Sequence, residues 1–213
     1  HDSDPLLSAV VEKFWEMEVD GLHSSKKTLS VNDKKVLDLW DRECAFVDGK
    51  FQLPIPWKPG ADVPDNKRLA LSRLRNLRTS LQKRGLYEPY NAEINKLLQK
   101  GFAEEVPKNP KASSERTVWY LPHHLVLNPK KPGKLRVVFD CAACFDGESL
   151  NDKCQSGPDL LNRLFCVLVR FRQHAFAFSG DVEAMYMQVA IPPEQRDALR
   201  FLWYSPAGEI ITY

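Results

Sequence analysis

The stretch from Phe176 to Ile191, FAFSGDVEAMYMQVAI, constrains the fold of this chain most strongly. Phe176 and Phe178 alternate with small residues, which is the two-residue period of a half-buried strand. Asp181 then stands where a turn is expected, but the residues after it are too apolar for a solvated loop. We expect a carboxylate inside such an apolar frame to have a partner or a metal ion that takes its charge. The alternative is an aspartate that ends a strand and caps the next segment.

The rest of the chain has the composition of a globular protein. Its 213 residues are 43% hydrophobic and 27% charged, which allows one large domain or a domain with extensions. No apolar run approaches the ~20 residues of a membrane span, and no signal-peptide pattern is visible, so the sequence predicts no membrane partner. The chain starts at His1 and ends at Tyr213 inside the β-prone run EIITY, and we expect both ends to continue in a longer protein.

Charge is spread unevenly along the chain. Residues 67–136 carry 16 Lys and Arg against 5 Asp and Glu, a net charge of +11. The flanking parts are acidic, with −5 over residues 1–66 and −4 over residues 137–213. The basic block favours a polyanion partner. A solvated helix face is the alternative, because Lys and Arg form helices well at surfaces.

The cysteine pattern argues against a disulfide framework or a zinc site. The chain has five cysteines, an odd number, and no secretion signal, so reduced thiols are expected. Cys141 and Cys144 have C-x-x-C spacing, but Cys154 and Cys166 supply no second pair. We therefore interpret them as ordinary thiols.

Three elements are predicted in the first third. Apolar spacing predicts a helix over residues 5–19, and Ser30 with Asp33 resembles a capping box that opens a second helix. The Asp-Gly pair at 48–49 predicts a hairpin over residues 44–55. Prolines over residues 54–64 indicate a linker. This third contains no recognisable catalytic constellation.

A basic helix is the clearest element of the middle block. Asp65 is placed to cap it, Gly85 to end it, and a second helix follows from about Pro89 to Gly101. The apolar stripe of the basic helix consists of Ala70, Leu74, Leu77 and Leu81, and that of the second helix consists of Tyr90, Ile94, Leu97 and Leu98. By default both stripes are core; a basic helix beside a polyanion is the functional alternative.

A hairpin with a basic, rigid tip is predicted next. Two β-prone runs, residues 117–127 and 134–139, flank the sequence NPKKPG. The basic residues that converge there are Lys130, Lys131, Lys134 and Arg136. Such a tip can hold phosphates, with lysines as point charges and arginine as a planar fork. Alternatively, the lysines and prolines protect an edge strand.

The last third is predicted to start with a helix over residues 158–173, which leads into the Asp181 strand. Its inward-packing residues are Leu160, Leu161, Leu164, Phe165, Leu168 and Val169. A turn over residues 192–200 and a hairpin over residues 201–213 complete the chain.

In this order, the segments INKLLQKGFAEEV, KLRVVFD, SLND and FSGDVEAMYMQVAIPPEQRDALRFLW resemble the reverse transcriptases of retroelements. The segments FWEME, DGKFQLPIPWKPG and YLPHHLVLNP are most similar to the Pol polyprotein of BEL/Pao-type LTR retrotransposons. The resemblance covers nearly the whole chain and is most specific around Asp181. It implies an α+β fold that is part of a right-hand polymerase, the fingers plus the first palm strand, behind a mainly helical N-terminal extension.

The resemblance also implies domains, partners and a location. Residues 1–64 would be a spacer between the protease and polymerase regions, residues 65–157 the basic helix and fingers, and residues 158–213 the start of the palm. The implied partners are an RNA or DNA template-primer, a deoxynucleoside triphosphate and the rest of the Pol polyprotein. The implied location is intracellular, in the cytoplasmic particles of the retroelement.

Site residues follow from the same resemblance. Asp181 would be the first metal-binding and catalytic carboxylate, with the Val182 carbonyl as a further ligand for two Mg²⁺ ions. Ala184 and Met185 would meet the triphosphate through backbone amides, and Tyr186 would exclude a ribose 2′-OH. Without the resemblance, Tyr186 is interpreted as a core aromatic residue beside Met185. Lys130 or Lys131 and Arg136 match the fingers groups that hold the triphosphate. Gln188 matches a motif position for which sequence reasoning offers no chemical role.

The family's second and third catalytic carboxylates, in a Tyr-x-Asp-Asp motif, do not occur in this sequence. Three hypotheses therefore stay open. The chain is a fragment of a reverse transcriptase, inactive alone; or a non-catalytic nucleic-acid-binding remnant; or a structural piece without a nucleic-acid role.

Overall fold

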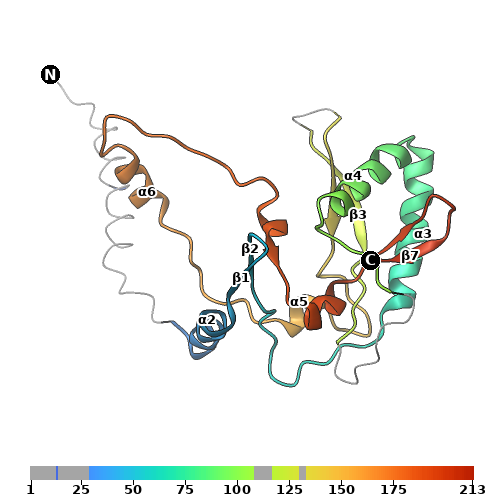
Figure 1. Cartoon of the computed structure of the whole chain (residues 1–213), viewed down its shortest axis with the longest axis horizontal. Coiled ribbons are helices and arrows are strands. Elements are labelled where there is room, and N and C mark those ends of the chain that lie inside the picture. The colour runs from blue at the N-terminus through green and yellow to red at the C-terminus, as the bar shows by residue number, and fades with distance from the viewer. Residues whose placement is uncertain (1–12, 14–28, 108–116, 130–132) are drawn as a thin grey trace.

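The computed structural model describes residues 13, 29–107, 117–129 and 133–213, and it is a mixed α+β structure, as predicted (Figure 1). The helices are α2 (Val31–Glu43), α3 (Lys67–Lys83), α4 (Tyr87–Gln99), α5 (Leu150–Lys153) and α6 (Leu164–Phe171), with the 3-10 helices η1 (Met185–Gln188) and η2 (Pro193–Leu199). The strands are β1 (Ala45–Val47), β2 (Lys50–Gln52), β3 (His123–Leu127), β4 (Leu135–Phe139), β5 (Val189–Ala190), β6 (Leu202–Tyr204) and β7 (Ile210–Thr212). The helix predicted over residues 5–19 lies outside the described residues.

The strands form small separate sheets. β1 pairs antiparallel with β2, β3 with β4, and β6 with β7, so all three predicted hairpins are confirmed. The third sheet has the order β1-β2-β5, in which β2 and β5 run parallel although some 140 residues of chain separate them. This long-range pairing joins the first third of the sequence to the segment that follows Asp181.

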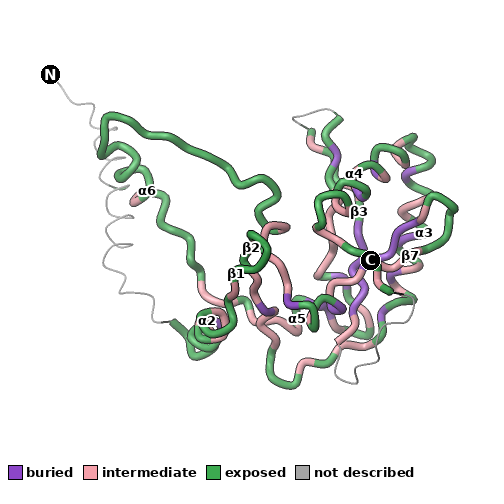
Figure 2. The backbone as a smooth tube through the Cα atoms, in the orientation of Figure 1, coloured by how far each residue is buried: buried purple, intermediate pink, exposed green. Residues whose placement is uncertain are grey.

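The main core lies where α3 and α4 cover the β3–β4 and β6–β7 hairpins (Figures 1 and 2). Leu74 and Leu81 of α3, Tyr90 and Ile94 of α4, and Trp203 of β6 are almost completely buried there. A smaller cluster forms around Trp119, Leu121 and Leu150. Burial of large aromatic and aliphatic side chains supplies most of the stabilisation of such a unit.

The local signals at helix ends and turns are mostly confirmed. Ser30 and Asp33 form the capping box at the start of α2. Asp48 and Gly49 both have positive φ, the conformation of a two-residue hairpin turn. Gly85 follows α3 with a φ of 66°, as a helix-ending glycine should.

The predicted cap of α3 needs correction. The N-cap is Asn66 rather than Asp65, and the Asn66 side chain does not cap the helix. Asp65 lies one residue before the N-cap, and its carboxylate accepts the Lys67 N–H at 2.9 Å. The Asn66 side chain is instead occupied by the backbone of Tyr120.

The helix predicted over residues 158–173 is shorter than expected, and its predicted inward packing is wrong. α6 covers Leu164–Phe171 and has no buried residue; Leu161 is 87% and Leu164 71% exposed. Figure 2 shows this segment mostly green, with an intermediate part at Phe165 and Cys166, away from the main core. The apolar stripe is present in the sequence, but no described element covers it, and a helix without tertiary packing is marginal.

The strand predicted at Phe176 and Phe178 does not form either. Both side chains are more than nine-tenths exposed, and the residues around them have no regular structure. Alternation predicts a strand only where a neighbouring strand accepts its hydrogen bonds, and none reaches this stretch in the described structure. Within the part of the chain that is described, no helix combines the length and the hydropathy needed to span a bilayer.

Candidate functional site

The predicted carboxylate site centres on Asp181, which is exposed rather than held in an apolar frame. It lies in an irregular segment just before η1, and its side chain accepts no hydrogen bond from any described residue. The expectation of a carboxylate enclosed by apolar side chains is therefore wrong. The alternative, a strand-end cap, is also wrong, because there is no strand before Asp181 and η1 has no side-chain cap.

The chain turns sharply between Asp181 and β5. Ala184 adopts the left-handed conformation, with φ 51° and ψ 43°, and its carbonyl accepts the Met187 N–H at 2.7 Å. The Gln188 Nε2 donates to the Glu183 carbonyl at 3.0 Å and closes the same turn. Gln188 thus has a structural role that its sequence position did not reveal: it ties the start of the turn to its end.

The residues at this turn do not by themselves fit the two Mg²⁺ ions that the resemblance implies. Among the described residues, no three His, Cys, Asp or Glu side chains gather closely enough to hold a metal ion. Asp181 and the Val182 carbonyl can offer oxygen ligands, but two bridging Mg²⁺ ions need several carboxylate oxygens. Further ligands would have to come from outside the described residues.

An ion pair that sequence reasoning missed joins this turn to α4. The Lys100 Nζ lies 2.7 Å from the Glu183 Oε1. The hydrogen bond and the charge of Lys100 lower the pKa of Glu183. The two residues are 83 positions apart, so only the folded chain reveals the pair. It places the acidic turn beside the basic block.

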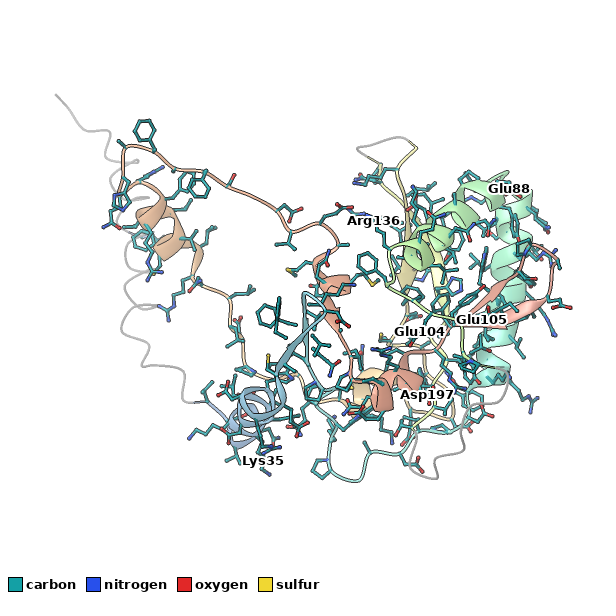
Figure 3. All side chains as sticks on the ribbon, viewed as in Figure 1. Lys35, Glu88, Glu104, Glu105, Arg136 and Asp197 are labelled. Carbon is teal, nitrogen blue, oxygen red and sulfur yellow. The ribbon has the colours of Figure 1, made fainter. Side chains whose placement is uncertain are left out.

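The residues predicted to meet a nucleotide are accessible. Met185 is 52% and Tyr186 86% exposed, so Tyr186 is not a core aromatic residue among the described elements. Arg136 and Lys134 lie on the β3–β4 hairpin and are exposed (Figure 3). Lys130 and Lys131 lie outside the described residues.

The outer side of α3 carries part of the basic block. Arg68, Arg75 and Lys83 are exposed, have no ion-pair partner among the described residues, and fall on one side of the helix by their spacing. By contrast, Arg73 lies 3.7 Å from the Asp140 carboxylate, and the Arg78 guanidinium stacks over the Tyr204 ring at 4.3 Å. The unpaired positive charges can therefore attract a polyanion.

Behind this surface lies a buried histidine. The His123 Nδ1 is 2.6 Å from the Tyr90 hydroxyl, and its Nε2 is 3.0 Å from the Leu202 carbonyl. Because a carbonyl only accepts, Nε2 carries the proton and Nδ1 accepts from Tyr90. Burial lowers the pKa of His123 to about 4, so the ring is neutral at pH 7. Strand alternation, applied to the His123-His124 pair, could have identified one buried histidine.

Two further polar side chains are held by hydrogen bonds: one joins the start of α3 to the segment before β3, and the other lies at the end of η2. The Asn66 side chain is fully buried and makes two hydrogen bonds to the Tyr120 backbone, at 2.7 and 2.8 Å. The Arg200 guanidinium donates twice to Asp197 Oδ1, at 2.8 and 3.0 Å. These contacts position the strands and leave the basic surface of α3 free.

No protein-family model matches the chain, and no curated protein or solved structure matches it significantly.

Proposed function

We propose that the chain is part of an RNA-directed DNA polymerase, the reverse transcriptase of a BEL/Pao-type LTR retrotransposon. The observation that carries the proposal is the sequence around Asp181, FSGDVEAMYMQVAIPPEQRDALRFLW, which follows a basic-tipped hairpin. Two features of the structure are compatible with it. Asp181 and Tyr186 are accessible to a ligand, and Lys100 ties their turn to the basic block.

The residues would act mainly by position and charge. Phosphoryl transfer needs stabilisation of negative charge on the transferred group and an aligned nucleophile. Arg136, exposed on its hairpin, would supply positive charge to the triphosphate. Tyr186 would occupy the space beside the sugar. Asp181 alone does not provide enough ligands for the two metal ions that the resemblance implies.

Primer extension tests this proposal. The 213-residue chain alone should show no template-directed synthesis with Mg²⁺. A polypeptide extended to a complete polymerase should be active, and Asp181→Asn in it should abolish synthesis without lowering the melting temperature. Glu209→Gln, at another exposed acid, is the matched control and should stay active. Synthesis by the short chain, or by the extended Asp181→Asn variant, would contradict the proposal.

A second candidate is a non-catalytic nucleic-acid-binding remnant, which is favoured by the unpaired charges on α3. Single-stranded binding should weaken with salt by about 0.7 log units per log unit of salt for each phosphate contact. Changing Arg68, Arg75 and Lys83 together to Gln should reduce that slope by about 2. The control removes the same charge from α2.

The matched control changes Lys34, Lys35 and Arg42 to Gln, all exposed on α2 (Lys35 is labelled in Figure 3). Equal effects of the α2 and α3 triple variants would show that binding follows net charge and not the α3 surface. Binding by the unchanged chain without primer extension in any extended form would favour this second candidate over the polymerase.

A further inference from the structure

The segment from Lys50 to Lys58 lies between two later parts of the chain and hydrogen-bonds to both. On one side, Phe51 and Gln52 of β2 are register partners of Val189 and Ala190 of β5. The Leu53 N–H continues this edge and donates to the Ala190 carbonyl at 3.0 Å.

The Ile55 N–H extends the same edge beyond β5. It donates to the Gln195 Oε1 at 2.7 Å, so beyond the end of β5 a side chain accepts the hydrogen bond in place of a strand carbonyl. Contacts of this edge therefore span residues 189–195.

The opposite edge binds residues 152–155. The Gln155 N–H donates to the Pro56 carbonyl at 2.8 Å, and its side-chain Nε2 donates to the Trp57 carbonyl at 3.0 Å. The Lys58 N–H donates to the Lys153 carbonyl at 2.8 Å. The Lys58 Nζ also donates to the Asp152 carbonyl at 2.7 Å.

The sequence LPIPW, residues 53–57, suits a segment that forms hydrogen bonds on both of its sides. Pro54 and Pro56 have no N–H, so only the amides of Leu53, Ile55 and Trp57 can donate in this stretch. The carbonyls of the prolines are used instead: Pro54 accepts from the Trp40 Nε1 at 3.3 Å, and Pro56 accepts from Gln155. Prolines also keep the segment extended.

The segment before β5 has few other attachments. α6 has no buried residue, and the stretch from Phe171 to Tyr186 is exposed throughout. The ion pair between Lys100 and Glu183 is itself exposed, and such pairs contribute little. Among the described contacts made by residues 171–190 themselves, the pairing with β2 is therefore the main constraint on where the turn of Asp181 lies.

We propose that residues 50–58 are a positioning strap, which holds the Asp181 turn in place through β5. This inference rests on the proposed polymerase function for the meaning of the turn, and it assigns a role in the active site to the N-terminal extension. The strap residues touch neither substrate nor metal in this proposal; they act through the backbone of residues 189–195.

Two pairs of variants test the strap. Leu53→Pro removes the amide that donates to Ala190, and Leu53→Ala keeps the amide while removing most of the side chain. Gln195→Leu removes the acceptor for the Ile55 amide, and Gln195→Glu keeps an oxygen acceptor there. Pro is compatible with the extended backbone at position 53, because Pro54 already restricts that residue to extended conformations.

The first measurement is amide hydrogen exchange of residues 183–195 in the 213-residue chain. Exchange should accelerate about fivefold or more in Leu53→Pro and in Gln195→Leu, because each loses a hydrogen bond of the strap. Leu53→Ala and Gln195→Glu should exchange like the parent. Equal exchange in the parent and all four variants, or acceleration that follows the side chain of Leu53 and not its amide, would overturn the strap.

The second measurement is primer extension by the extended polymerase. Leu53→Pro and Gln195→Leu should lower kcat at least about tenfold with little change in KM for template-primer. Gln195→Glu, which keeps the acceptor, should have the kcat of the parent. An unchanged kcat in a variant with accelerated exchange would contradict the positioning role. If the extended parent shows no synthesis, the polymerase proposal fails, while exchange still decides whether the strap exists.

Discussion

Acid should destabilise this chain through His123. The residue is 7% exposed, and its ring lies among those of Tyr90, Phe139, Phe201 and Trp203. Both ring nitrogens are hydrogen-bonded in the neutral form, and protonation would put a second donor against the Tyr90 hydroxyl. Burial lowers the pKa from 6.5 to about 4. The neutral ring therefore stabilises the fold above pH 6.5, and this contribution is lost as the pH falls from 6.5 to 4.

The size of this effect follows from the two pKa values. A shift from 6.5 to about 4 corresponds to about 3 kcal/mol in full, of which about 2 kcal/mol is lost between pH 7 and pH 4.5. Urea unfolding at the two pH values measures the loss. His123→Gln, which retains a donor and an acceptor but does not titrate, should lose about 2 kcal/mol less than the parent. His124→Gln, at the exposed neighbour, should behave like the parent. Equal losses in the parent and in His123→Gln would refute the reasoning.

Three other changes have expected outcomes. Asn66→Leu should lower the unfolding free energy by about 2–4 kcal/mol in urea, because it leaves two buried backbone groups unpaired. Gly157→Ala should lower the melting temperature more than Gly147→Ala; both have positive φ, but a Cβ at Gly157 would stand 3.1 Å from a Val36 carbon, whereas Gly147 has open space. Under the proposed function, Tyr186→Val in the extended polymerase should admit ribonucleotides in single-nucleotide incorporation, and unchanged discrimination would remove Tyr186 from that role.

The sequence predicted local structure well where short-range chemistry decides it. The capping box at Ser30 and the Asp48-Gly49 turn depend on residues within one or two turns of chain. The same holds for Gly85 at the end of α3. The β3–β4 and β6–β7 hairpins are also local, because their strands are neighbours in the sequence.

Prediction failed where a partner had to be supplied from far along the chain. The stripe of α6 and the alternation at Phe176 predicted packing, but no described element covers them. Conversely, Asp65 was expected to cap α3, but the N-cap residue is Asn66, and its side chain hydrogen-bonds the backbone of Tyr120, 54 residues away. Patterns within a short window show which face is apolar, and they do not show what will cover it.

For the candidate site too, the residues could be predicted but the contacts that position them could not. Sequence patterns identified Asp181, Tyr186 and Arg136 as residues of interest, and the structure places each of them at the surface. The contacts that hold the turn in place, Lys100 to Glu183 and Leu53 to Ala190, span 83 and 137 positions and leave no mark in any local pattern. These two contacts are visible only in the folded chain.

A division of the chain at residue 64, as the family resemblance suggests, would cut through a hydrogen-bonded unit. β5 would lose its parallel partner, and Gln155 would lose the carbonyl of Pro56. A two-residue strand has no independent stability, so residues 181–190 would then be held mainly by an exposed ion pair and by their continuation into η2. Residues 50–58 therefore belong to the same hydrogen-bonded unit as residues 152–155 and 189–195. A chain that begins at residue 65 should retain the core of α3, α4 and the two hairpins, because that core contains no residue from the extension. It should lose the defined position of Asp181.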